Sequence, residues 1–171
     1  VASIEAQVSF IAEEKDGSTE VVFRFDGRNL AGETLVVYEE MLYGGKRIAE
    51  HKEDDDEKQT IYFPSIETEA SDQDTQERMS FAGQKVILED VVHYKNLLPG
   101  KKYTISGILM DQETGGPILD AKGKEITAEK EFTAKNPEGD ETVVFQFDGS
   151  ILAGKVTVAF EELFLEKKSI A

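Results

Sequence analysis

An internal repeat constrains the fold of this chain more than any other feature of its sequence. Residues 1–49 align with residues 123–171 without a gap, at a constant offset of 122 positions. TEVVFRFDGRNLAGETLVVYEEMLYGGKRIA overlies ETVVFQFDGSILAGKVTVAFEELFLEKKSIA, which pairs Phe23 with Phe145. Solenoid proteins repeat every ~20–50 residues, so a period of this length is typical of an array of whole domains. The sequence therefore predicts that one period is one domain.

The two copies of the repeat lie near the two ends of the chain. The expected domain boundaries therefore do not coincide with the ends of the chain. We expect residues 1–61 to be the C-terminal half of one repeat and residues 62–171 to be the following repeat without its last strand. The segment EHKEDDDEKQT follows Ala49 but has no counterpart after Ala171. A half sandwich leaves unpaired sheet edges, so we expect association with neighbouring repeats, or self-association by strand or half-domain complementation.

Alternating apolar residues indicate β-strands. In TEVVFRFDG the residues Val21, Phe23 and Phe25 fall on one side of an extended chain, as do Tyr103 and Ile105 in KKYTISGILMD. Turns rich in glycine and proline, such as LLPGKK and NPEGDE, separate such segments at intervals of roughly 8–12 residues. These features predict an all-β chain that folds as an immunoglobulin-like antiparallel β-sandwich.

The charge of the chain excludes two classes of partner. Lys and Arg number 19 against 35 Asp and Glu, for a net charge of −16. A surface this acidic repels nucleic-acid phosphates and anionic lipids, so we expect neither nucleic acid nor membrane as a partner. The sequence has no cysteine, which excludes disulfides and thiolate metal sites.

Five motifs together resemble the VaFE repeat domains of Gram-positive surface-anchored adhesins. They are VAFEELF, FDGSILAGK, NLLPGKKYTISGILMD, HKEDDDEKQT and PSIETEASD. The resemblance covers essentially the whole chain, and within that family are domains that form an intramolecular Thr-Gln ester bond. It implies an extracellular stalk repeat anchored to the cell wall of a Gram-positive bacterium.

The resemblance also implies which residues form the bond. In the family, a threonine in a first-strand motif I-x-T-x-A attacks the side-chain amide of a glutamine in a last-strand motif H-x-D-x-x-D-x-x-Q-T. The first motif falls on IETEA and gives Thr68. The second falls on HKEDDDEKQT and gives Gln59, with His51 as a residue that orients the site. Glu53 stands where the motif has Asp and keeps a carboxylate there.

Ester formation from these groups requires acid–base help, because a threonine hydroxyl is a weak nucleophile and an amide is a weak electrophile. Two buried carboxyl groups that share one proton can supply both roles. The resemblance implies an Asp and a Glu, which fall on Asp90 and Glu161, with Glu39 the equivalent of Glu161 in the first copy. Asp148 and Asp26, in the FDG motifs, are alternatives for the second acid.

The phase of the repeats separates the bond-forming residues. Thr68 belongs to the second domain and Gln59 to the first, so within the family pattern they are not each other's partners. We expect the bond to join Thr68 of one chain to Gln59 of another, with two unreacted sites as the alternative. Because the reaction occurs once per site, we expect no enzymatic turnover and no cofactor.

Other functions have weaker support in the sequence. An adhesive module for a host ligand would need an exposed apolar patch, which no segment singles out. A hydrolase with paired carboxylates has no substrate motif to support it. YKNLLPGKKYTISG is also similar to pilin repeats with a Lys-Asn isopeptide bond, but SIETEA has no lysine.

The acidic run EDDDE, residues 53–57, is typical of a solvated face. It lacks the ligand spacing and the glycine of an EF-hand, so we expect no bound metal, although calcium is conceivable there. His93, in VVHYKNL, is expected on a strand surface rather than as a ligand.

Overall fold

The computed structural model describes residues 3–171, which form strands, turns and irregular segments. Val1 and Ala2, the first residues of the expected half-domain 1–61, lie outside the described residues. The chain divides into two compact units, Val1–Leu30 and Ala31–Ala171, which are described separately. The described residues contain no helix that is long and apolar enough to cross a membrane.

All the strands of residues 3–171 lie in the second unit. They are β1 (Thr34–Val36), β2 (Glu39–Tyr43), β3 (Lys46–His51), β4 (Thr60–Tyr62), β5 (Ser65–Asp72), β6 (Val86–Lys95), β7 (Lys102–Asp111), β8 (Thr127–Thr133), β9 (Gly139–Phe147), β10 (Thr157–Leu165) and β11 (Lys168–Ser169).

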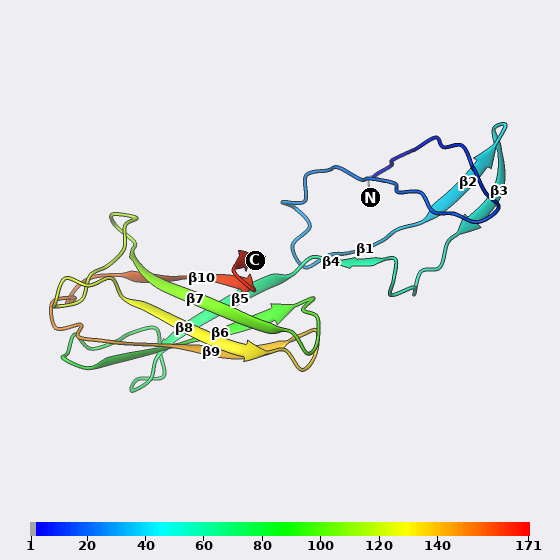
Figure 1. Cartoon of the computed structure of the whole chain (residues 1–171). Coiled ribbons are helices and arrows are strands. Elements are labelled where there is room, and N and C mark those ends of the chain that lie inside the picture. The colour runs from blue at the N-terminus through cyan, green and yellow to red at the C-terminus, as the bar shows by residue number, and fades with distance from the viewer. Residues whose placement is uncertain (1–2) are drawn as a thin grey trace. The chain divides into compact units, whose positions relative to one another are not determined.

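Strands β5 to β11 form a sandwich of two antiparallel sheets (Figure 1). One sheet has the strand order β11-β10-β7-β8 and the other has the order β5-β6-β9. In the three-stranded sheet β6 is central, with β5 and β9 on its two sides. The predicted all-β sandwich fold is confirmed in residues 65–171.

The core lies between these sheets and follows the alternation of the sequence. Tyr103 and Ile105 on β7 are 2% and 0% exposed, as their spacing predicts. The buried cluster takes its other strand residues from β6, β7, β8, β9 and β10: Val92, Tyr94, Leu109, Phe132, Val143, Phe145 and Leu163. Burial of one large apolar side chain contributes about 1.5–3 kcal/mol, so this cluster is the main stabilising element of the sandwich.

Residues 31–62 form two short ladders outside that core. β1 pairs with β4 and β2 pairs with β3, both antiparallel. The β2–β3 hairpin exposes its apolar side chains, including Leu42 at 51% and Ile48 at 60%. These ladders have hydrogen bonds but little apolar burial.

Residues 17–25 correct one expectation from the sequence, because Val21, Phe23 and Phe25 do not lie in a strand. The equivalent residues of the second copy form β9, which is paired along its length with β6. Among residues 3–171, residues 17–25 belong to none of the paired strands. Alternation alone does not make a strand, because the ladder with a neighbouring strand stabilises it.

Candidate functional site

Thr68 lies on β5, at the edge of the three-stranded sheet. It is opposite Val92 on β6, and Ala70 is opposite Asp90. Cross-strand partners share a face of the sheet, and alternate residues of one strand do too. The Thr68 hydroxyl and the Asp90 carboxyl therefore point to the same side of the sheet.

Glu161 reaches the same place from the other sheet. It lies on β10, opposite Gly107 on β7. The Oγ1 of Thr68 donates a hydrogen bond to Oε2 of Glu161, with 3.3 Å between the two oxygens. The Thr68 side chain is exposed and Glu161 is half-buried, so the hydroxyl sits where the buried acids meet solvent.

Gly107, opposite Glu161, makes room for the ring of Phe145. A β-carbon at position 107 would lie 2.6 Å from Cζ of Phe145 and 3.5 Å from Oε1 of Glu161. Real β-carbons essentially never approach another atom as closely as the first of these distances. A glycine inside a strand commonly marks such a close approach. Gly107 is not among the site residues predicted from the sequence, although its position within TISGILM was a signal.

Asp90 and Glu161 form a buried acid pair. Asp90 is 1% exposed, and neither of its carboxyl oxygens has a hydrogen-bond partner among the described residues, nor has Oε1 of Glu161. Two ionised carboxylates cannot donate to each other, whereas a proton on one lets it donate to the other. Leaving such buried oxygens unpaired costs free energy, so one proton shared by the pair is favoured.

The pKa values of the two carboxyls agree with one shared proton. Burial, and then the nearby carboxyl of Asp90 and its charge, raise the pKa of Glu161 to about 8. Burial also raises the pKa of Asp90. At neutral pH the pair therefore holds a proton that two solvated carboxyl groups would have lost.

The two alternative acids lie in other surroundings. Asp148 accepts hydrogen bonds from the backbone and the hydroxyl of Ser150, which hold the pKa of Asp148 below its ordinary value. Asp26 accepts a hydrogen bond from the guanidinium of Arg28, which lowers the pKa of Asp26. The geometry thus brings Glu161, and not Asp148, to Asp90.

Gln59, His51 and Glu39 lie together in the first copy. His51 is opposite Glu39 in the β2–β3 ladder, and the carbonyl of Gln59 accepts from the backbone N–H of Val37 at 2.9 Å. Within residues 3–171, no hydrogen bond or ion pair joins Gln59 or His51 to Thr68. The amide of the expected site, on Gln59, therefore lies in a different ladder from the hydroxyl, on Thr68.

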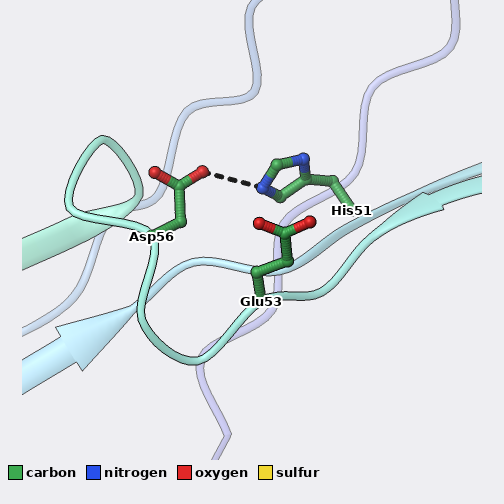
Figure 2. A group of neighbouring side chains, drawn as sticks. All are labelled: His51, Glu53 and Asp56. Atoms are coloured by element: carbon green, nitrogen blue, oxygen red, sulfur yellow. Dashed lines mark hydrogen bonds and ion pairs between the residues drawn. The ribbon is translucent and has the colours of Figure 1, made fainter.

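His51 belongs to a small polar cluster with Glu53 and Asp56 (Figure 2). The ligand atoms of the three side chains lie within 4.8 Å of one another, and Nε2 of His51 is 2.9 Å from Oδ2 of Asp56. One imidazole and two carboxylates could ligate a divalent ion such as zinc. The hydrogen bond between His51 and Asp56 accounts for the arrangement without one. His93 is exposed and lies 2.6 Å from Asp140, as expected for a strand-surface residue.

Comparison with known families gives one match that covers the chain. The model of a family described as the T-Q ester bond containing domain matches residues 1–63 and, separately, residues 64–171. No curated protein gives a significant match.

Two of the similar solved structures are of a bacterial adhesin from Mobiluncus mulieris containing intramolecular disulfide, isopeptide, and ester bond cross-links. The first has 15% identity and a TM-score of 0.43, over 61% of this chain and 44% of the other. The second has 17% identity and a TM-score of 0.41, over 61% of this chain and 45% of the other. The chain thus spans less than half the length of these structures.

Proposed function

Because the chain belongs to the family of T-Q ester bond containing domains, we propose that it is a stalk repeat of a bacterial surface adhesin, tied by an ester between Thr68 and a glutamine side chain. One observation carries the proposal. The Thr68 hydroxyl is 3.3 Å from Glu161, whose pKa is raised to about 8 beside the buried Asp90. This is the arrangement that the chemistry of ester formation requires.

The reaction joins the Thr68 oxygen to the carbonyl carbon of a glutamine side chain. As Oγ1 attacks, the acid pair accepts the hydroxyl proton, and the tetrahedral intermediate then loses its nitrogen. That nitrogen takes a proton from the pair and departs as ammonia, which leaves the ester. No oxidant, nucleotide or other co-reactant is needed, because one alcohol and one amide give one ester and one ammonia.

The glutamine that we propose is Gln59 of a second molecule. Each chain carries the threonine motif once and the glutamine motif once, in different copies of the repeat. Within one chain the two residues belong to separate ladders. A bond between chains would therefore use both motifs of every molecule.

Such a tie suits a protein that bears load. A bond between chains closes no loop within one chain, so its effect is mechanical. Under force, a covalent bond between the strand that carries Thr68 and the segment that carries the glutamine must break before the two separate. We place the repeat outside the cell, on the cell wall of a Gram-positive bacterium, beside neighbouring repeats of the same protein.

Intact-mass spectrometry under denaturing conditions tests the proposal. We expect oligomers that survive denaturant, each lighter than the sum of its chains by one ammonia per bond. Thr68→Ala should give only unmodified monomer, whereas Thr127→Ala, on the exposed side of β8, should behave like the parent chain. Unmodified monomer from the parent chain at neutral pH would refute the ester.

A further inference from the structure

A short joint connects the β1–β4 ladder of the first repeat to the sandwich of the second. β4 ends at Tyr62 and β5 begins at Ser65, which leaves a joint of residues 63–64. Tyr62 is paired with Thr34 of β1, and Ser65 is paired with Lys95 of β6. The chain therefore changes its pairing partner at the joint, from β1 in one repeat to β6 in the next.

The backbone of the joint is satisfied without a strand that continues across it. Phe63 donates its N–H to the carbonyl of Glu33 and accepts a hydrogen bond from the N–H of Gly32, each at 3.0 Å. Pro64 has no N–H, so a change of partner at this residue leaves no backbone donor unpaired. The regular pairing of both ladders thus stops at the joint, and this is the place where the connection between the repeats can bend.

The side chain of Asn96 spans this joint. Asn96 follows the last residue of β6, and its Nδ2 donates hydrogen bonds to the carbonyl oxygens of Glu33, at 3.0 Å, and Phe63, at 3.2 Å. Phe63 and Gly32 already donate to these two carbonyls, and a carbonyl oxygen has a second lone pair that can accept from the amide. One side chain of the sandwich thus holds the ends of both chain segments of the preceding ladder.

The backbone around Asn96 fixes the amide to the sandwich. Asn96 has φ 60°, in the left-handed region that asparagine adopts more readily than most residues with a β-carbon. The next residue, Leu97, is 2% exposed in the core, and its N–H donates to the carbonyl of Pro137 at 3.0 Å. The loop that carries the amide is therefore anchored in the sandwich and does not belong to the ladder that it contacts.

A close approach adds a second contact between the two repeats. Gly32 has φ 78°, and a β-carbon at this position would lie 3.1 Å from Oγ of Ser65. That distance is tighter than nine in ten real β-carbon contacts. The segment that precedes β1 therefore lies directly against the start of β5, on which the sandwich begins.

We propose that Asn96 is a clamp between successive repeats, which fixes the orientation of the sandwich relative to the ladder of the repeat before it. The partner of this small surface is the preceding repeat of the same chain. Asn96 is not part of the connection through residues 63–64, so it limits bending only through its two hydrogen bonds. A side-chain amide suits this role because its two N–H groups can donate to two acceptors at once.

The clamp has a mechanical consequence if Gln59 and Thr68 are ester-bonded as proposed above. Force then passes from one bond to the next through residues 60–67, most of which lie in β4 and β5. A strand rises about 3.3 Å per residue and a fully extended chain about 3.3–3.6 Å, so pulling lengthens this segment very little. Bending at the joint is the main motion left, and Asn96 opposes it. This consequence rests on the proposed function, whereas the clamp itself does not.

The distance between two spin labels tests the clamp in the whole chain. The chain has no cysteine, so Lys58→Cys and Val144→Cys give one label beside the β1–β4 ladder and one on β9, both at exposed positions. A Thr68→Ala background excludes the ester. Pulsed electron paramagnetic resonance measures the width of the label–label distance distribution, and we expect Asn96→Gly to widen it about twofold, because domains joined by a small interface move relative to each other.

Two further variants separate the amide from charge and from the backbone. Asn96→Gly removes the side chain and keeps a residue that tolerates positive φ. Asn96→Asp keeps the shape of the side chain but places a carboxylate, which accepts and does not donate, against two carbonyl oxygens, so it should widen the distribution at least as much. Asn136→Asp, in an exposed loop of the same sandwich, makes the same change of charge and should leave the width unchanged.

A distribution for Asn96→Gly that is no wider than that of the background chain would overturn the clamp. Equal widening by Asn136→Asp would overturn it too, because charge and not the amide would then be responsible. The outcome does not depend on the ester: a distribution that widens as expected, in a chain whose Thr68 parent forms no ester, would support the clamp and leave only the proposed function refuted.

Discussion

Glu39 and Glu161 hold the same position in two copies of one sequence, yet their surroundings differ. Glu161 faces the buried Asp90 from a complete sandwich, and its pKa is raised to about 8. Glu39 lies in a two-stranded ladder opposite His51, with no strand of a second sheet behind it among the described residues. The hairpin register is the same in both copies. Register is thus encoded locally, whereas the chemistry of the glutamate depends on the strands that cover it.

The segments that precede the two hairpins also differ in structure between the copies. Residues 139–147 form β9 beside β6, and the equivalent residues 17–25 form no strand. Both segments alternate polar and apolar side chains in the same way. Alternation predicts which side of a strand will be buried. Whether the segment forms a strand depends on the strands that it pairs with and packs against.

The largest expected difference between the copies is chemical. Glu161→Gln removes one carboxyl of the acid pair and should slow ester formation about 100-fold or more. Glu39→Gln is the matched control and should leave the rate unchanged. Denaturing gels of timed samples measure both rates. Equal slowing by the two variants would mean that the copies are chemically equivalent.

The next difference is in packing. Leu163 is 0% exposed and Met41, its equivalent, is 44% exposed. Leu163→Ala should lower the free energy of unfolding by about 2–5 kcal/mol, because it leaves a cavity in the core. Met41→Ala should change it by less than about 0.5 kcal/mol. Urea denaturation compares the variants, and a cost above about 2 kcal/mol for Met41→Ala would show that the first hairpin is covered in solution.

The pH dependence of stability separates the two glutamates further. Glu161 has its pKa raised from 4.5 to about 8, so between these values the folded chain holds a proton that the unfolded chain has lost. The free energy of unfolding should therefore fall as pH rises from about 5 to about 8, by at most about 1.4 kcal/mol per pH unit from this group.

Thermal melts in a Thr68→Ala background measure this slope without ester formation. Glu161→Gln should flatten it, and Glu39→Gln should not. A slope that is unchanged by Glu161→Gln would assign the proton to another group.

The smallest difference is in the two hairpin turns. Gly44 and Gly45 have positive φ in the first copy, whereas the second has Glu166 with φ 57° and Lys167 with φ 139°. Backbone conformations that disfavour a β-carbon cost free energy, so Lys167→Gly should stabilise the sandwich by about 1 kcal/mol. Lys168→Gly, one residue later in β11, should not stabilise it. Chemical denaturation is the measurement, and a loss of stability in Lys167→Gly would contradict the expected strain.

Much of the sandwich could be predicted from the sequence because its strands alternate regularly. Tyr103 and Ile105 are buried as their spacing predicts. The failure at Val21 and Phe23 has a physical reason: periodicity is a local property, and the pairing that makes a strand is not. A partner strand that is distant in the chain cannot be read from the segment itself.

The site was predicted in the same uneven way. Family resemblance placed Thr68, Asp90 and Glu161, and the structure brings these three together. The resemblance could not decide between Glu161 and Asp148 as the second acid. That depends on which of the two carboxyls faces Asp90 from the opposite sheet, and only the folded structure shows this.

The glycine opposite Glu161 has an evolutionary consequence. The ring of Phe145 lies in a space that exists only because residue 107 has no side chain, 2.6 Å from where its first carbon would be, whereas Oε1 of Glu161 is at an ordinary contact distance of 3.5 Å. A side chain at position 107 would therefore clash with the ring, whichever residue stands at position 161. Among relatives, we expect positions 107 and 145 to change together, so that a side chain at the first is accompanied by a smaller residue at the second.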